Sequence, residues 1–167
     1  MKKFNYILFI FLSMIVVPVL SAQNTDVFKI KGFYLDMSRI EVKEIYDNLK
    51  KNEVAQYISF EKENFRDLIK LDNEFSSMGN KIEIAYEEDE KLKELTFQYK
   101  TVNILFKAEK LSAAEFVQQF KDEFGIAEME YKDMGFVKKW SYTDKKRNIK
   151  ISIDDSKNLR LQKFKNK

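Results

Sequence analysis

Two stretches of the chain combine the same helix-start signal with the same spacing of apolar residues. Each begins with Ser-x-x-Glu, first at Ser38 and again at Ser112. In this capping box the serine hydroxyl and the glutamate carboxylate each accept a backbone N–H at the start of a helix. Apolar residues then recur every three or four positions, which places them on one helical face: Val42, Ile45, Tyr46 and Leu49 in the first stretch, and Phe116, Val117, Phe120 and Phe124 in the second. We therefore expect helices over about 39–51 and 113–124, the second ending at Gly125.

Two further stretches alternate apolar and polar residues, the pattern of a half-buried strand. They contain Ile82, Ile84 and Tyr86, and later Ile149, Ile151 and Ile153, each set followed by acidic residues that suit a hairpin loop. A helix followed by antiparallel strands is therefore found twice. We expect an α+β fold of two such repeats, with the helices packed on one face of a sheet. The first repeat spans 23–106, with an insertion at about 54–80, and the second spans 107–167.

The remaining segments are less regular. Residues 54–60 are rich in β-branched and aromatic residues and predict a strand. Apolar spacing predicts a helix over 64–75, with turn residues at 76–80. Residues 28–35 fit either a short strand or an extended lead-in. Further strands are expected at 102–106, 127–131, 136–143 and 159–164.

The N-terminus has the layout of a secretory signal peptide. Met1-Lys2-Lys3 is basic, residues 6–20 are almost wholly apolar, and the small residues Ser21 and Ala22 follow. A membrane anchor is the alternative, but the apolar run is shorter than the about 20 residues needed to span a bilayer, and it contains Pro18. We expect residues 1–22 to be a signal peptide cleaved after Ala22. The mature protein is then periplasmic or secreted and has no membrane anchor.

The composition removes several kinds of chemistry. The chain has no histidine and no cysteine, so it lacks the usual general base, the usual zinc ligands and any disulfide. Its four glycines form no phosphate-binding loop. The acidic run 87–90 lacks the ligand spacing of a calcium loop, and a solvated hairpin tip is the more ordinary interpretation. We expect no metal and no cofactor. Nucleic-acid binding is not expected either, because the basic residues form no continuous run.

Charge and aromatic residues supply the candidate binding features. Residues 23–99 carry 12 Lys and Arg against 17 Asp and Glu, whereas residues 100–167 carry 16 against 10. A chain with an acidic half and a basic half can associate head to tail, can steer a dipolar partner, or can simply have a solvated surface. Trp140 and Tyr142 share one face of a predicted strand, and Tyr131 lies on the strand before it. These three residues are either core residues or aromatic anchors for a partner, a role for which Trp and Tyr are enriched at interfaces.

The helix entry Leu35-Asp36-Met37-Ser38-x-x-Glu41-Val42, the strands after it and the repetition resemble a known group of proteins. This group comprises the β-lactamase inhibitor proteins and the small envelope lipoproteins of the SmpA/OmlA type. The resemblance covers most of residues 33–164. It implies helices on one face of an antiparallel sheet and an open face that binds another protein. Asp36 stands where this family usually has Gly, and the cysteines of both branches are missing.

Three functions follow as hypotheses. The first is an exported, non-enzymatic protein-binding module of the cell envelope, with the partner on the open face of the sheet and Trp140, Tyr142 and Tyr131 as candidate contacts. The second is a hydrolase that uses paired carboxylates. The third is a carrier of a small apolar ligand held between helix and sheet.

Overall fold

A computed structural model describes residues 27–51, 58–71 and 79–164 of the chain. The expected signal peptide, most of the expected strand 54–60 and most of the expected turn 76–80 lie outside these residues. The described elements, in chain order, are α1 (Arg39–Lys51), β1 (Ile58–Glu63), β2 (Arg66–Leu71), β3 (Lys81–Tyr86), β4 (Leu92–Phe97), α2 (Tyr99–Phe106), α3 (Ala113–Phe124), β5 (Glu130–Asp133), β6 (Lys138–Asp144), β7 (Ile149–Asp154) and β8 (Leu159–Lys163).

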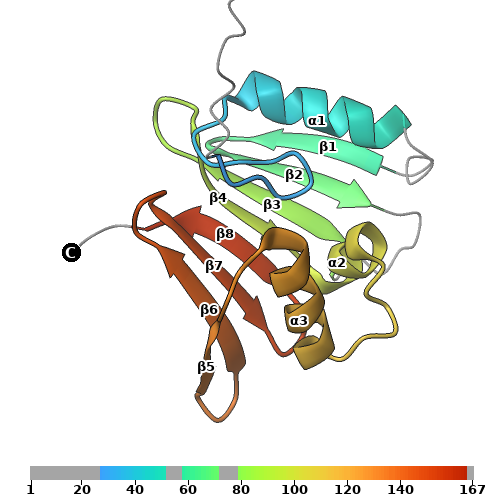
Figure 1. Cartoon of the computed structure of the whole chain (residues 1–167). Helices are drawn as coiled ribbons and strands as arrows, with labels where there is room; N and C mark the ends of the chain where they lie inside the picture. The colour runs from blue at the N-terminus through green and yellow to red at the C-terminus, as the bar shows by residue number, and fades with distance from the viewer. Residues whose placement is uncertain (1–26, 52–57, 72–78, 165–167) are drawn as a thin grey trace, which may run out of the picture.

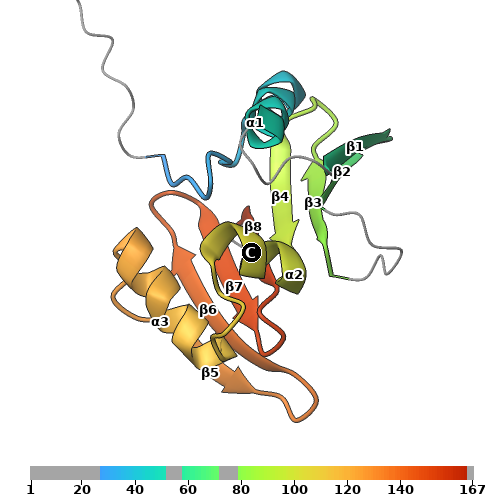
Figure 2. The same cartoon turned by 90° about the vertical axis from the view of Figure 1, so that its right-hand side faces the viewer.

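The strands form one eight-stranded antiparallel sheet in the order β1-β2-β3-β4-β8-β7-β6-β5 (Figure 1). This confirms the predicted α+β class. The early strands β1–β4 occupy one half of the sheet and the late strands β5–β8 the other, and the two halves meet where β4 pairs with β8. Helix α1 lies beside the early strands and α3 beside the late ones (Figures 1 and 2). No helix in the described part of the chain has both the length and the apolar character needed to cross a membrane.

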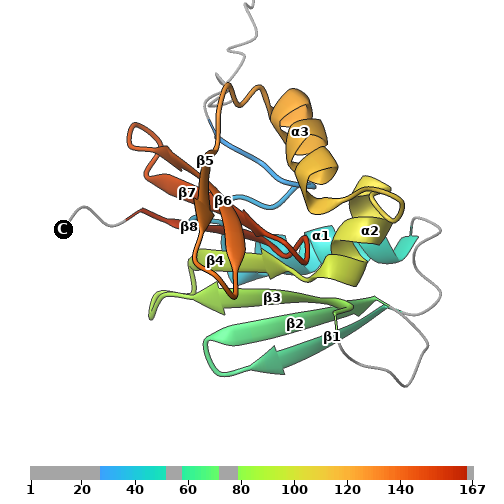
Figure 3. The ribbon, with the colours of Figure 1, turned by 90° about the horizontal axis from the view of Figure 1, so that it is seen from below.

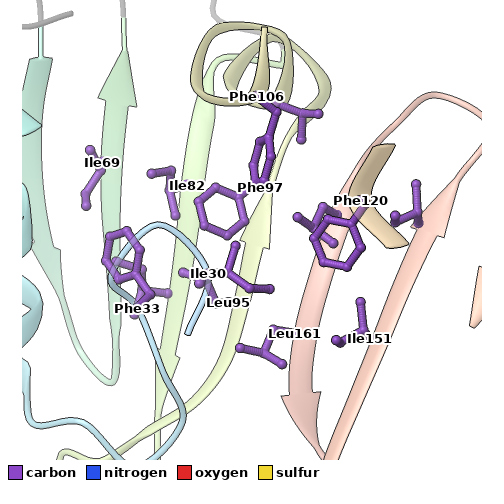
Figure 4. Packing of buried hydrophobic residues seen from close by; sticks show 14 of the residues in the cluster. Ile30, Phe33, Ile69, Ile82, Leu95, Phe97, Phe106, Phe120, Ile151 and Leu161 are labelled. Atoms are coloured by element: carbon purple, nitrogen blue, oxygen red, sulfur yellow. The ribbon is translucent and has the colours of Figure 1, made fainter. Parts of the chain in front are cut away.

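The hydrophobic core follows one face of this sheet. Cross-strand partners lie on the same face, and the registers link one apolar row across all eight strands: Phe60, Ile69, Ile82, Phe97, Leu159, Ile153, Trp140 and Tyr131. Side chains from α1, α2 and α3 join the same buried cluster. Figure 4 shows its centre, where Phe97 lies close to Phe106 of α2. Burial of this apolar row is the main stabilising contribution to the fold.

Both predicted capping boxes are present. The Ser112 hydroxyl accepts the Glu115 backbone N–H at 3.3 Å, and the Glu115 carboxylate accepts the Ser112 N–H at 2.7 Å. The Ser38–Glu41 pair makes the same two bonds at 3.3 and 2.6 Å. Gly125 ends α3 with φ of 64°, and its N–H donates to the Lys121 carbonyl. Local sequence signals therefore set the start of both helices and the end of α3.

A buried ion pair attaches the first turn of α1 to the sheet. The Arg39 guanidinium donates to both carboxylate oxygens of Asp67, with Nε–Oδ2 at 2.9 Å, and Asp67 is fully buried. The Tyr86 hydroxyl donates to the same carboxylate at 2.7 Å, and the guanidinium carbon lies 5.0 Å from the centre of the Tyr86 ring. The side-chain hydrogen bond to Asp67 raises the pKa of Arg39, and burial together with the hydrogen bond to Asp67 raises the pKa of Tyr86. Asp67 thus accepts hydrogen bonds from two side chains, while the Glu63 and Arg66 carbonyls and the Glu90 carboxylate accept further bonds from the Arg39 guanidinium.

The predicted helix over 64–75 is wrong for the residues that the structure describes. Residues 66–71 form strand β2, in which Asp67, Ile69 and Leu71 are buried and alternate with more exposed residues. Phe65 adopts φ of 50° in the tight turn between β1 and β2. The apolar spacing of this segment fits the period of a helix as well as that of a strand, and pairing with β3 stabilises the strand. Accordingly, most of the expected insertion 54–80 that is described belongs to the sheet.

The predicted strand over 102–106 is also wrong, because Tyr99–Phe106 forms helix α2. Gln98 starts the helix from an extended conformation, and its carbonyl accepts the Val102 N–H at 2.9 Å. The Tyr99 N–H donates to the Asn158 side chain at 2.9 Å. The sequence around Gln98 carries no capping signal, and a distant residue from the β7–β8 turn supplies the missing acceptor.

The approach to α1 contains an unusual backbone conformation. Asp36 adopts φ of 68°, in the left-handed region that glycine enters most easily and that Asp tolerates better than most residues. Its carboxylate lies 2.5 Å from the Lys163 ammonium of β8. Just before it, Ile30 and Phe33 form an isolated bridge and are both fully buried. Residues 28–35 therefore form a tight turn that packs into the core.

Candidate functional site

The face of the sheet opposite the core carries mostly polar and charged side chains. We call it the open face, and define it by the residues Lys81, Glu83, Glu94, Thr96, Arg160, Ser152, Asp154 and Lys139, which alternate along their strands with core residues. The cross-strand row Glu83, Thr96, Arg160, Ser152 and Ser141 runs over five strands. Both halves of the chain therefore contribute to one surface.

A hollow of about 790 Å³ lies on this open face. The β5–β6 hairpin extends toward β3 and β4 (Figure 3), so that Val137 and Lys139 line the same hollow as Gly79 and Lys81. Ser152, which is only 7% exposed, also lines it. A second hollow of about 730 Å³ shares Glu94 and Arg160 with the first. The two hollows therefore adjoin across the β4–β8 junction.

Charges of both signs line the first hollow. Arg160 forms an ion pair with Glu94 across the β4–β8 junction, with Nη2–Oε2 at 2.5 Å. Burial lowers the pKa of Lys139, and the nearby cations Lys150 and Arg160 lower it further, while Asp154 acts in the opposite direction. The late half of the open face thus concentrates positive charge around Lys139. In the early half of the hollow, Glu83 and Glu94 outnumber Lys81 and give a net negative charge.

Hydrogen bonds fix the rim of the hollow. The Asp154 carboxylate accepts the backbone N–H of Asn158 at 2.8 Å and its side-chain amide at 2.9 Å, and Asn158 in turn caps Tyr99. On the other side, the Gln98 amide donates to Glu83 at 2.6 Å and accepts the Gly79 N–H at 3.1 Å. The polar groups around the rim are therefore held in place by the protein itself.

Position 79 requires a glycine. Its φ is 89°, and a Cβ at this position would lie 2.1 Å from an edge carbon of the Tyr99 ring. The absence of a side chain lets that ring lie against the backbone and line the hollow. Gly79 also accepts the Lys100 N–H at 2.7 Å, which joins the β3 lead-in to the start of α2.

The predicted contact residues lie elsewhere. Trp140 pairs with Ile153 and Tyr142 with Ile151, and both isoleucines are fully buried, so the two aromatic residues face the core and are half-buried against it. Tyr131 lies at the end of the same row, 48% exposed, with its ring centroid 5.1 Å from that of Trp140. The structure brings the three together at the edge of the core face rather than on the open face. Their role as contacts stays a prediction.

Sequence reasoning missed the polar and charged residues of the open face and its two hollows. The signal was present, because Lys81, Glu83, Lys150, Ser152 and Asp154 occupy the polar positions of the two alternating stretches. An alternating strand exposes its polar side when one face of the sheet is uncovered. What the sequence does not contain is the β4–β8 pairing that places these residues together.

The carboxylates of the hollow bear on the hydrolase hypothesis. Glu83, Glu94 and Asp154 line it, and each accepts a hydrogen bond from a neighbouring amide or guanidinium group. In the described residues no group of three or more acidic side chains is placed to hold a metal ion. A carboxylate hydrolase stays a prediction.

Comparison of this chain with protein families, with curated proteins and with solved structures finds no match.

Proposed function

We propose that this chain is an exported binding protein of the cell envelope that docks a partner protein on the open face of its sheet. The observation that carries the proposal is the hollow of about 790 Å³ lined by β3, β4, β6, β7 and β8. Polar groups that are already held in place lose less conformational freedom when a partner binds, which favours binding at this hollow.

The charges suggest the character of the partner. Lys139, Lys150 and Arg160 favour acidic side chains over the late half of the face, whereas Glu83 and Glu94 favour basic ones over the early half. Complementary charges speed association and fix the orientation of the partner more than they add to affinity. We therefore propose a partner surface of mixed charge, with an apolar contact to Tyr99 and Val137 at the rim.

The architecture is also part of the proposal. We infer that the chain consists of two repeats, each a helix followed by four antiparallel strands, with the helices on one face of the sheet. The strand order supports this, because β1–β4 and β8–β5 run outward in mirror sequence from the central β4–β8 pair. The binding face then lies on the seam between the two repeats, at their adjoining inner strands. Export rests on the N-terminal sequence, and N-terminal sequencing of the mature protein should begin at Gln23.

Site-specific photocrosslinking in the producing cells tests the docking surface. A photoreactive amino acid replaces Thr96, which is half-exposed on the open face, and in a matched control replaces Glu44, which is exposed on α1. A discrete covalent adduct with one protein is expected at Thr96 and absent at Glu44. Adducts of the same kind at both positions, or none at Thr96, would remove the proposal.

A further inference from the structure

The outer edge of β5 has no strand beside it in the described part of the chain, and all four of its residues are exposed. An unpaired edge presents backbone donors and acceptors that another strand can use. We propose that this edge pairs with the same edge of a second copy of the chain. The two sheets then become one continuous sheet across a two-fold axis.

The direction of the backbone groups on β5 can be worked out from two hydrogen bonds. The Met134 N–H donates to the Val137 carbonyl at 3.0 Å, so the peptide groups of Met134 point toward β6. The Lys138 carbonyl accepts a backbone N–H from the β7–β8 turn, so the peptide groups of Lys138 point away from β5. Along a strand of an antiparallel sheet, the backbone N–H and C=O groups of successive residues point alternately to one side of the strand and to the other. The N–H and C=O groups of Tyr131 and Asp133 therefore point outward, to the free edge.

Only some registers of self-pairing use these outward groups. In one of them Tyr131 lies opposite the copy's Tyr131, and the two residues exchange both backbone hydrogen bonds. Glu130 then lies opposite the copy's Lys132 on the open-face side, and Lys132 lies opposite the copy's Glu130. The two neighbouring registers that also match the backbone place Lys132 against Lys132 or Glu130 against Glu130. Charge therefore selects the register centred on Tyr131.

The charges on β5 differ from those of a protected edge. Charged residues often keep an edge strand from pairing with its own copy. The Lys132 ammonium lies 3.1 Å from Glu130, with both side chains well exposed, so one face of the strand carries one positive and one negative group. In the two neighbouring registers this pair places like charges opposite each other and repels the copy. In the register centred on Tyr131 it places opposite charges together and attracts the copy. The edge is thus complementary to itself.

The apolar residues near β5 fit the same arrangement. Tyr131 ends the core row of this sheet, and in the paired state it would continue into the copy's Tyr131 and Trp140. Met134 and Phe136 at the tip of the β5–β6 hairpin are strongly exposed, Phe136 completely so. The register centred on Tyr131 brings this tip alongside residues 126–128 of the copy. Pairing would then reduce the exposure of Met134 and Phe136 in both chains.

Charge exchange in the protein made from the full-length sequence tests the register. Sedimentation velocity of the wild type between about 5 and about 500 μM should show a concentration-dependent dimer, as a moderate affinity gives. E130K and K132E should each weaken it by about tenfold or more, since both ion pairs become repulsive. The double variant E130K/K132E should recover the dimer, and an equimolar mixture of the two single variants should form a heterodimer. A wild type that stays monomeric, or single variants that associate as well as the wild type, would overturn the proposal.

A backbone variant tests the pairing separately from the side chains. Y131P removes the outward N–H while leaving the donors toward β6 in place, and proline is tolerated on an edge strand at such a position. Its control, Y131A, removes the same ring but keeps the N–H. Dimerisation should be lost in Y131P and only reduced in Y131A, with circular dichroism unchanged in both. A dimer that persists in a folded Y131P variant would refute strand pairing.

Discussion

Replacement of Asp67 by alanine probes the buried ion pair between α1 and the sheet. Asp67 is fully buried, Arg39 is 12% exposed, and the Tyr86 hydroxyl shares the same carboxylate. Asp67→Ala leaves the Tyr86 hydroxyl without its acceptor and takes from the largely buried Arg39 guanidinium its buried carboxylate partner, so that only Glu90 and two backbone carbonyls still accept from Arg39. Removing one partner of a buried ion pair costs about 3 to 5 kcal/mol. We expect a loss of that size in the free energy of unfolding.

Urea denaturation of the variant and of a matched control measures this loss. Asp47→Ala removes a carboxylate from another ion pair, Lys43–Asp47 at 2.6 Å, in which both side chains are about half-exposed. Such an exposed pair contributes about 0.3 to 0.5 kcal/mol. The slope of free energy against urea should stay unchanged in both variants, which shows that only stability has moved.

A third variant separates the lost pair from the buried charge that remains. Replacing Arg39 by methionine, Asp67 by leucine and Tyr86 by phenylalanine removes the guanidinium, the carboxylate and the hydroxyl that meet there. Because apolar replacements of a buried pair are often neutral or stabilising, this triple variant should be more stable than Asp67→Ala alone. If Asp67→Ala and Asp47→Ala differ by less than about 1 kcal/mol, the ion pair is not the attachment that we describe.

The remaining predictions concern pH and backbone geometry. Hydrogen bonds from Tyr34 and Ser38 lower the pKa of Glu41 from 4.5 to about 2. A depressed pKa stabilises the fold above the unfolded value, so this contribution is complete above about pH 4.5 and is lost as the pH falls through about 2. NMR titration of the Glu41 carboxyl should show that inflection, and Tyr34→Phe should raise it; an ordinary value in the wild type would contradict the geometry. Gly79→Ala should cost about 1 to 2 kcal/mol more than Gly135→Ala in thermal unfolding, because both have positive φ but only Gly79 has a ring against it. Equal losses would show that the ring moves freely.

Local signals in the sequence predicted the local structure well. The capping boxes at Ser38 and Ser112 and the cap at Gly125 depend on residues within one helical turn, so the sequence near them was sufficient. The alternation around Ile84 and Ile151 likewise predicted buried strand faces that the structure confirms. These features need no information about the rest of the chain.

The wrong predictions arose where residues far apart in the sequence determine the local structure. Helix α2 depends on Asn158, which lies 59 residues further along the chain and supplies its missing cap. Strand β2 depends on pairing with β1 and β3, and its apolar residues fit a helix equally well. The hollow depends on the β4–β8 pair, which brings Glu94 and Arg160 together. Such long-range pairings leave no signal in a local window of sequence.

The aromatic residues illustrate the same limit. Trp140 and Tyr142 were correctly placed on one face of one strand, but the sequence does not say which face of the sheet is covered. The registers with Ile153 and Ile151 settle that both face the core. A binding role for the two residues then requires a partner that reaches the edge of the core face next to Tyr131.

Binding of the photocrosslinked partner to a charge-exchanged open face tests the central claim most directly. The double variant E94R/R160E keeps the ion pair across the β4–β8 junction but reverses the charges that it presents. Its free energy of unfolding should match the wild type within about 1 kcal/mol, since the pair is partly exposed. Its affinity for the partner, measured by calorimetry, should fall by about tenfold or more. An unchanged affinity in this folded variant would show that the partner does not dock on the open face.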